Sequence, residues 1–225
     1  MVVMLPQFID QQLLEMALSH RSSLNEKEQS GTSASQSNER LEFLGDAVLE
    51  LATTLYLYQH RPEDHEGQLT AYRSALVRTE TLAALAVELG LDQKMYLSKG
   101  EELSGGRHNV SLLADLMEAV IGALYLDQGW TVTRDFLAEH LFNKFDSILH
   151  NHSYRDQKSL LQETVQGRGS AAPVYQVVKE EGPDHHKRFT VSVAVDDQVL
   201  ARGEGSSKQR AQQAAAQAAL KQLTE

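Results

Sequence analysis

The residues best able to carry chemistry lie in one acidic segment, residues 38–49. If this segment is helical, Glu39, Glu42 and Asp46 share one face, because residues three, four and seven apart lie on the same side of a helix. Carboxylates gathered on one face repel one another unless a cation lies among them. The residues facing away are mostly leucine, so the acidic face is not simply the solvent side of a surface helix. The segment is therefore a candidate site for a divalent cation.

A second acidic pair, Asp115 and Glu118, has the same three-residue spacing. It lies in an otherwise apolar stretch, residues 112–121, where an unpaired carboxylate is costly to bury. A third candidate, Glu66, stands just before Gly67 at a predicted helix start. Oxygen ligands suit Mg²⁺ and Mn²⁺. Two acidic helices that converge could hold one or two such ions to hydrolyse a phosphodiester.

Spacing alone leaves two interpretations open, a metal site and ordinary exposed helix charges. Glu50 continues the acidic face four residues after Asp46, and we interpret it as a solvent-exposed flank. The absence of cysteine excludes disulfides, thiolate zinc sites and thiol nucleophiles. No serine pattern supports a nucleophilic mechanism. Six histidines have no spacing typical of a zinc site or a catalytic triad: His20, His60, His65, His140, His150 and His152.

The elements that must position these residues divide the chain in two. Residues 1–150 are rich in apolar residues at helical spacing and predict an all-α domain, with breaks at glycines such as Gly129. The first acidic helix is predicted to bury one apolar face, formed by Leu41, Leu44, Val48, Leu51 and Leu55. A polar linker is predicted over residues 151–157.

Residues 158–225 have a different pattern of apolar residues from residues 1–150. Alternating apolar residues predict three strands, and Asp196-Asp197-Gln198 predicts a tight turn between the last two. A short helix precedes the strands, and Ser207 caps an alanine-rich helix that follows them. This order, α-β-β-β-α, predicts a compact α+β domain.

Charge is spread unevenly over the 225 residues. The net charge of −10 comes from residues 1–152, with 11 basic and 22 acidic residues, whereas residues 153–225 hold 10 basic and 9 acidic ones. This asymmetry indicates two units with different tasks. No apolar run approaches the ~20 residues of a membrane-spanning helix, so we expect no membrane association. The N-terminus lacks the basic and apolar regions of a secretory signal, and a cytoplasmic protein is expected.

The segment Asn38–Leu49 resembles the signature stretch of the ribonuclease III family almost residue for residue. The resemblance extends through Glu66-Gly67, the segment 104–106 and the segment 113–119, and residues 158–225 resemble a double-stranded-RNA-binding domain. It implies a homodimeric, Mg²⁺-dependent endoribonuclease, with Mn²⁺ as a possible substitute and no small-molecule organic cofactor. Double-stranded RNA would be the substrate, cut to leave 5′-phosphate and 3′-hydroxyl ends with short 3′ overhangs.

The same resemblance implies roles for particular residues. Metal-binding carboxylates fall on Glu42, Asp46, Asp115 and Glu118, of which Asp46 and Glu118 are also expected to be catalytic. Additional catalytic acids fall on Glu39 and Glu66, and a dimer contact falls on Phe43. The positions expected to bind RNA are Gln162, Glu163, His185, Lys208 and Arg210. The sequence departs from the family at Gln209 and Gln212, which replace two positions that are often basic.

Two other functions are compatible with parts of this pattern. A catalytically silent dimeric double-stranded-RNA-binding protein would keep both domains, although the complete set of acidic residues argues against it. A metal phosphohydrolase for small nucleotides would leave residues 153–225 without a purpose. Cleavage of a long RNA duplex in the presence of Mg²⁺ distinguishes these functions from an endoribonuclease.

Overall fold

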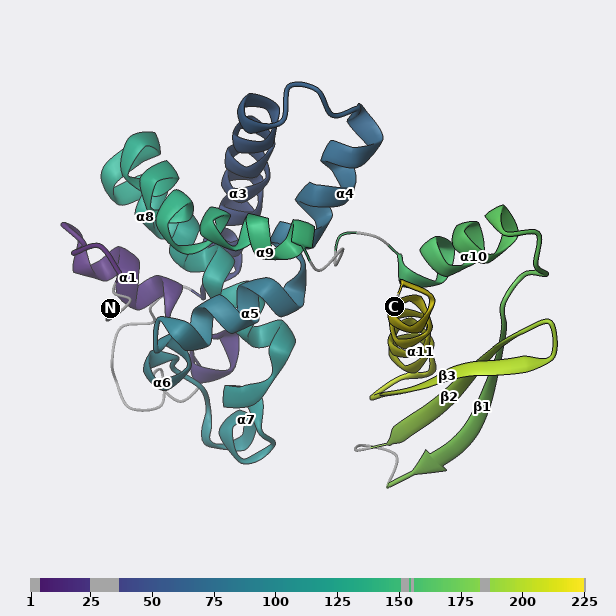
Figure 1. The fold of residues 1–225 in the computed structure, drawn as a ribbon. Coiled ribbons are helices and arrows are strands. Elements are labelled where there is room, and N and C mark those ends of the chain that lie inside the picture. The colour runs from purple at the N-terminus through teal and green to yellow at the C-terminus, as the bar shows by residue number, and fades with distance from the viewer. Residues whose placement is uncertain (1–4, 25–36, 151–153, 155, 183–186, 225) are drawn as a thin grey trace. The chain divides into compact units, whose positions relative to one another are not determined.

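The computed structural model describes residues 5–24, 37–150, 154, 156–182 and 187–224. The chain forms two compact units, Met1–Asn151 and His152–Glu225 (Figure 1). Helix α10 of the second unit begins at Gln157 and is capped by Asp156. No helix in the described part of the chain is long and apolar enough to cross a membrane.

The first unit is helical, as the sequence predicts. Its elements are α1 (Gln11–Ala17), η1 (Arg21–Ser23), α3 (Glu39–His60), α4 (Glu66–Val77), α5 (Thr79–Glu88), α6 (Leu91–Lys94), α7 (Lys99–Leu103), η2 (Gly106–His108), α8 (Val110–His140), η3 (Phe142–Lys144) and α9 (Phe145–His150). Helices α3 and α8 pack side by side, and α5 also packs on α8 (Figure 1). The predicted break at Gly129 is present, because its non-helical backbone divides α8 into two segments.

The buried face of α3 differs from the predicted one. Leu41 and Val48 are buried as expected, but Leu51 and Leu55 are exposed. The buried face consists of Leu41, Gly45, Val48, Leu49, Ala52, Thr53 and Leu57. The prediction followed only large apolar residues, whereas α8 lies against the small side chains of α3, where two helices can approach closely. Leu51 and Leu55 are therefore left on the outer side.

The second unit has the predicted α-β-β-β-α order. It consists of α10 (Gln157–Gly167), β1 (Val174–Glu181), β2 (Arg188–Val195), β3 (Gln198–Gly205) and α11 (Lys208–Thr224), and the strands form an antiparallel sheet in the order β1-β2-β3. The predicted turn between β2 and β3 is present, with Asp196 and Asp197 both at positive φ, as in a type I′ hairpin turn.

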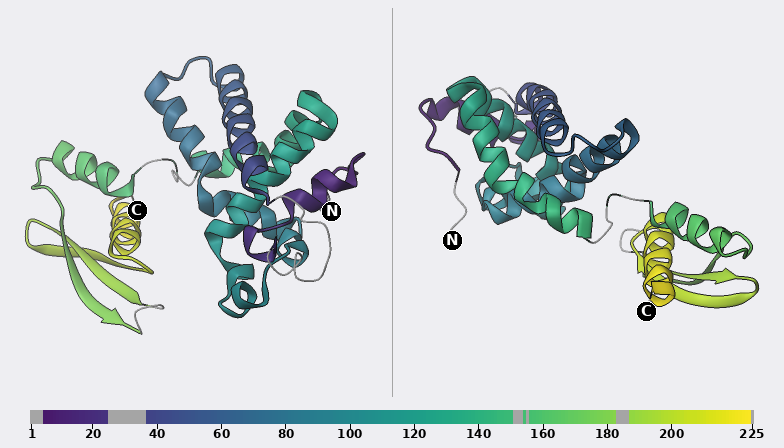
Figure 2. Two further views of the ribbon diagram at one scale, coloured as in Figure 1. Left: turned by 180° about the vertical axis from the view of Figure 1, so that it is seen from behind. Right: turned by 45° about the horizontal axis from the view of Figure 1, so that its top comes forward.

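Both helices of the second unit cover one face of its sheet (Figure 2). The core between them contains Leu161 and Val165 of α10, alternate valines of β2, and four alanines of α11. Burial of this face against alanine brings α11 close to the strands. The first turn of α11 and the Gln162-Glu163 pair of α10 are left exposed, and these positions include four of the predicted RNA-binding residues.

Candidate active site

The acidic residues of the first unit are brought together by a close crossing of α3 and α8. A Cβ atom on Gly45 would overlap the backbone carbonyl of Glu118, and one on Gly122 would overlap the carbonyl of Leu41. The two helix backbones are therefore in direct contact, which only glycine permits at these positions. Glu42 lies one turn before Gly45, so this contact places its side chain beside those of α8.

Three carboxylates meet at this crossing. Glu42 of α3 and Asp115 and Glu118 of α8 each offer an oxygen atom within 4.8 Å of the others. All three side chains are partly buried. We call these three residues the acidic cluster. The two acidic motifs, which are far apart in the sequence, thus form one group of oxygen ligands.

The electrostatics of the acidic cluster are those of like charges held together. Burial and the nearby charge of Asp46, followed by those of Asp115 and Glu42, raise the pKa of Glu118 to about 7. Burial also raises the pKa of Glu42 and of Asp115. A bound divalent cation would relieve this repulsion, and an all-oxygen ligand set suits Mg²⁺ or Mn²⁺.

Asp46 belongs to the surroundings of the cluster. It lies one turn after Glu42 on α3 and is exposed, and it is not among the three residues whose oxygens lie within 4.8 Å. Its charge still reaches the site, since it is the largest electrostatic contribution to the raised pKa of Glu118. The structure thus places Asp46 at the edge of the cluster, on the solvent side.

Glu39 and Glu66, the two additional acids, are not part of the acidic cluster. Glu39 accepts a hydrogen bond from Ser37 at 2.8 Å and pairs with Arg21 at 3.3 Å, and both contacts lower the pKa of Glu39. Glu66 is the first residue of α4, where its exposed carboxylate accepts a hydrogen bond from Thr70 at 3.2 Å. Helix phase places Glu39 on the same face as Glu42. It does not predict that Arg21 pairs with the Glu39 carboxylate.

Two further residues act on the acidic cluster through their charge. Glu50, interpreted from the sequence as a solvent-exposed flank, has a side chain that is 39% exposed; it pairs with Arg73 of α4 at 2.9 Å, and its charge contributes to the raised pKa of Glu118. The spacing of His20 in the sequence predicts neither a zinc site nor a catalytic triad. In the structure, its charge opposes the effect of burial on the pKa of Asp115. No local signal in the sequence could have placed His20 there, because it lies far from Asp115 along the chain.

The outer side of α3 carries a row of exposed apolar side chains. Phe43 is 82% exposed, Leu51 is 53% exposed, and Leu55 and Tyr58 follow toward the C-terminal end of the helix. Phe43 is adjacent in sequence to Glu42, so the row begins beside the acidic cluster. Water is a poor environment for so many large apolar groups on one helix, and such a row is typical of a protein contact surface.

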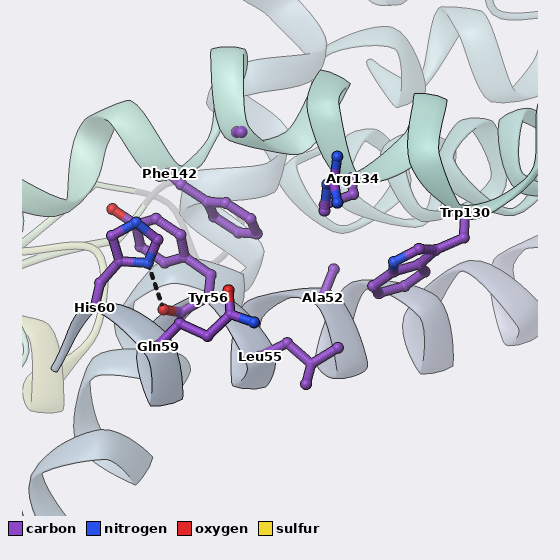
Figure 3. Close-up of a pocket in the computed structure, with 9 residues that line it drawn as sticks. Ala52, Leu55, Tyr56, Gln59, His60, Trp130, Arg134 and Phe142 are labelled. Carbon is purple, nitrogen blue, oxygen red and sulfur yellow. Dashed lines mark hydrogen bonds between the residues drawn. The ribbon is translucent and has the colours of Figure 1, made fainter. Parts of the chain in front are cut away.

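The first unit also has a hollow of about 310 Å³ at a distance from the carboxylates along α3 (Figure 3). It lies between the C-terminal half of α3 and the part of α8 beyond Gly129. Figure 3 shows Tyr56, Phe142 and Trp130 around it, with the His60 ring nitrogen within hydrogen-bond distance of the Tyr56 carbonyl at 2.8 Å. Its lining contains no carboxylate, so it offers no metal ligands.

In the second unit, four of the five predicted RNA-binding residues can be placed. Gln162 and Glu163 are exposed on α10, and Lys208 and Arg210 are exposed in the first turn of α11. His185 lies outside the described residues. The Gln162 side chain donates a hydrogen bond to the Gln166 side chain at 3.5 Å.

Both cations at the start of α11 contact neighbouring residues. The Lys208 ammonium lies 3.1 Å from the Glu180 carboxylate and 5.6 Å from the centre of the Phe189 ring. Arg210 donates a hydrogen bond to the Ser206 hydroxyl at 3.1 Å. The carboxylate beside Lys208 offsets part of the positive charge that the sequence predicts at this helix end.

Two family models match the chain. The model described as "Ribonuclease-III-like" matches residues 10–145, and the "Double-stranded RNA binding motif" matches residues 157–223. Among curated relatives, ribonuclease 3 of Pelotomaculum thermopropionicum is 46% identical over 94% of this chain and 86% of its own length. Ribonuclease 3 of Enterococcus faecalis is 45% identical, over 96% of this chain and 92% of its own.

Solved structures give the same result. The nuclease domain of ribonuclease III from Campylobacter jejuni, in a study of flexibility in a region involved in dimer formation, is 37% identical with a TM-score of 0.56. The match covers 62% of this chain and 92% of that one. The structure of Dicer from Pichia stipitis is 31% identical with a TM-score of 0.50, and the match covers 98% of both chains.

Proposed function

The chain belongs to the ribonuclease III family and is an endoribonuclease of double-stranded RNA, and we propose that its acidic cluster holds the divalent cation with which it cuts. One observation carries the proposal: carboxylates from two helices converge within 4.8 Å, although no positive side chain pairs with these three carboxylates among the described residues. The silent RNA-binding protein has no such observation in its favour.

The donor set fits a hard cation such as Mg²⁺, with Mn²⁺ as a substitute. Glu42, Asp115 and Glu118 would bind it directly, and Asp46 would complete the site from the solvent side. A cation bound there would supply a Lewis acid that activates water and offsets charge on the phosphate. Without it, four carboxylates beside a phosphodiester would repel the substrate. Glu118, with its pKa raised to about 7, must lose its proton before it can act as a ligand.

Glu39 and Glu66 are proposed as additional catalytic acids by their positions in the family pattern. Arg21, which pairs with Glu39, can hold this carboxylate in place beside the start of α3. Glu66 opens α4, the helix whose Arg73 pairs with Glu50. Both acids would act on groups around the reacting phosphate, since neither lies within the acidic cluster.

The second unit is proposed to hold the duplex by shape. A-form RNA presents 2′-hydroxyls in a wide minor groove and regularly spaced phosphates across about 16 base pairs. Gln162 and Glu163 offer groups that can bind 2′-hydroxyls, whereas Lys208 and Arg210 at a helix N-terminus suit phosphates. His185 is proposed to enter the neighbouring minor groove, as its position in the family pattern implies. We propose domain bounds of 1–150 and 158–225.

We further propose that two copies assemble through the exposed apolar row of α3 that begins at Phe43. Such a dimer would cut both strands and leave 5′-phosphate and 3′-hydroxyl ends with short 3′ overhangs. Precursors of ribosomal and messenger RNA in the cytoplasm are the proposed substrates.

The experiment that tests this function compares two activities of the whole chain. Wild-type protein is expected to cut a long RNA duplex in Mg²⁺ and to bind it without cutting in EDTA. Glu118→Gln is expected to bind the duplex without cutting it in either condition. If the wild-type protein binds the duplex but leaves it intact in Mg²⁺ and in Mn²⁺, the protein is a silent RNA-binding protein and the proposal is wrong.

A further inference from the structure

A lysine on α10 reaches the surface where α11 lacks positive charge. Lys158 lies in the first turn of α10, and its ammonium donates a hydrogen bond to the amide oxygen of Gln212 at 2.8 Å. Gln212 is the fifth residue of α11 and one of the two positions where the sequence departs from a basic pattern. The ammonium of Lys158, a residue of α10, thus lies beside Gln212 of α11.

The close contacts of the Lys158 ammonium are with neutral groups. The ammonium lies 5.0 Å from the centre of the Tyr175 ring, and no carboxylate in the described part of the chain lies within 4.0 Å of it. An amide oxygen and an aromatic face stabilise an ammonium without neutralising it. Lys208 differs, because Glu180 lies beside its ammonium. Of these two lysines, Lys158 is therefore the stronger source of positive potential.

Lys158 also opens onto space that a ligand can enter. A polar hollow of about 470 Å³ lies between α10 and α11, and its lining includes Lys158, Gln162 and Gln209. Tyr175 also lines this hollow; its hydroxyl is buried, and no hydrogen-bond partner for it exists among the described residues. A buried donor without a partner is costly unless an incoming oxygen or water satisfies it.

The one acid in this hollow is already engaged. Asp156 accepts a hydrogen bond from the Ser159 backbone at 2.9 Å, which caps α10, and another from the Gln213 side chain at 2.6 Å. These bonds tie the start of α10 to α11 and hold Lys158 in register with Gln212. These contacts hold the Lys158 ammonium in a fixed position beside Gln212.

We propose that Lys158 contacts a phosphate of the RNA duplex, and that Gln212 is a positioning residue that holds its ammonium at this surface. This inference rests on the proposed function, since it concerns how the same substrate is held. In this proposal, Lys158 of α10 supplies positive charge that the neutral Gln209 and Gln212 of α11 do not. The contact affects affinity and not the chemical step.

The test measures duplex binding by the whole chain in EDTA at several salt concentrations. Lys158→Gln is expected to weaken binding about tenfold at low salt and to flatten the slope of log K against log salt by about 0.9. Lys221→Gln is the matched control: it removes the same charge near the opposite end of α11, about 13 Å beyond Gln212 along the helix axis, and is expected to change neither quantity.

A charge exchange makes the test specific to position. In the double variant Lys158→Gln/Gln212→Lys, the ammonium sits on α11 and the amide on α10, so affinity and salt slope are expected to return to nearly wild-type values. Lys158→Met, which removes the charge and keeps an unbranched aliphatic side chain, serves if Lys158→Gln unfolds. Thermal unfolding confirms that each variant is folded.

The outcomes separate this inference from the proposed function. If Lys158→Gln or Lys158→Met is folded and binds like wild type with the same slope, Lys158 does not contact phosphate. If the double variant is folded and binds no better than the single variant, Gln212 does not mark the position of the contact. Wild-type protein that fails to bind or cut the duplex counts against the proposed function instead.

Discussion

Gly45 of α3 lies directly against the backbone carbonyl of Glu118 in α8. The residue that must carry no side chain thus touches the backbone of the most perturbed carboxylate in the site. Gly122 makes the reciprocal contact with Leu41, so the two helices are locked at two points one turn apart on each helix. The distance between Glu42 and its partners on α8 is set by the backbone and not by the flexible side chains.

Gly45→Ala is expected to damage the site and the fold together. The added methyl group must push α3 and α8 apart, and such overpacking costs typically about 1–3 kcal/mol of folding free energy. Metal affinity and cleavage should fall by a larger factor, since the carboxylates separate.

Gly100→Ala is the control for this variant. Gly100 lies in α7, where a Cβ meets nothing closer than the Ser98 hydroxyl at 4.0 Å, so the stability should change by less than about 1 kcal/mol. Urea unfolding and Mn²⁺ titration measure the two effects. Gly45→Ala with wild-type metal affinity would show that the crossing does not set the ligand spacing.

Glu118→Ala and Asp46→Ala are expected to cost several kcal/mol in the chemical step, because a cation held by these groups acts on charge that develops in the transition state. Duplex affinity should stay the same or rise, since each variant removes a negative charge near phosphates. Glu50→Ala is the comparison, because Glu50 lies beyond the cluster and pairs with Arg73. Single-turnover cleavage that is equally slow in Glu50→Ala and Glu118→Ala would overturn the assignment of ligands.

The stability of the metal-free protein is expected to fall as the pH rises from 4.5 to about 7. The pKa of Glu118 rises from 4.5 to about 7 on folding, so in this interval the folded protein binds more protons than the unfolded chain. Stability must then decrease with pH, and it levels off above pH 7. Bound Mg²⁺ should cancel the decrease, because it favours the ionised form.

Urea midpoints at pH 5.5 and 8, in EDTA and in Mg²⁺, measure this dependence. Glu118→Gln should flatten the curve in EDTA, since the amide does not titrate. Equal pH dependence in the wild type and in Glu118→Gln would mean that another group is responsible.

Phe43→Asp is expected to weaken self-association and to lower cleavage. The ring is 82% exposed in the single chain, so the substitution should leave the folding of the chain nearly unchanged while placing a charge in the proposed contact. Sedimentation gives the oligomeric state, and Tyr58→Asp tests the far end of the same row. A Phe43→Asp protein that sediments as a stable dimer would remove Phe43 from the interface.

The sequence predicts the order of elements well, because each depends on local patterns. The three strands, the Asp196-Asp197 turn and the capping Ser207 are all read from neighbouring residues. The pairing of the two acidic motifs follows from the family resemblance, whereas spacing alone leaves it open. The close crossing that produces it involves glycines, which a search for apolar periodicity passes over.

What the sequence does not predict depends on contacts between distant elements. Arg21 pairs with Glu39, Arg73 pairs with Glu50, and Gln212 holds the ammonium of Lys158. In each case a long cationic side chain reaches its partner from another helix or loop and so changes the local charge. Helix phase fixes only the direction in which a residue leaves its own helix.

The break at Gly129 divides α8 into two segments. The first carries Asp115 and Glu118, and the second lines the hollow of Figure 3. In an unbroken helix, inserting or deleting one residue turns everything beyond it by about 100° relative to what precedes it. At Gly129 the backbone leaves the helical conformation, with φ 74° and ψ −172°, so the segment beyond it is not held in phase with Asp115 and Glu118. Residues can therefore be inserted, deleted or substituted in the segment that lines the hollow of Figure 3 without changing the orientation of Asp115 and Glu118. Gly129 thus uncouples the helical phase of the two segments of α8.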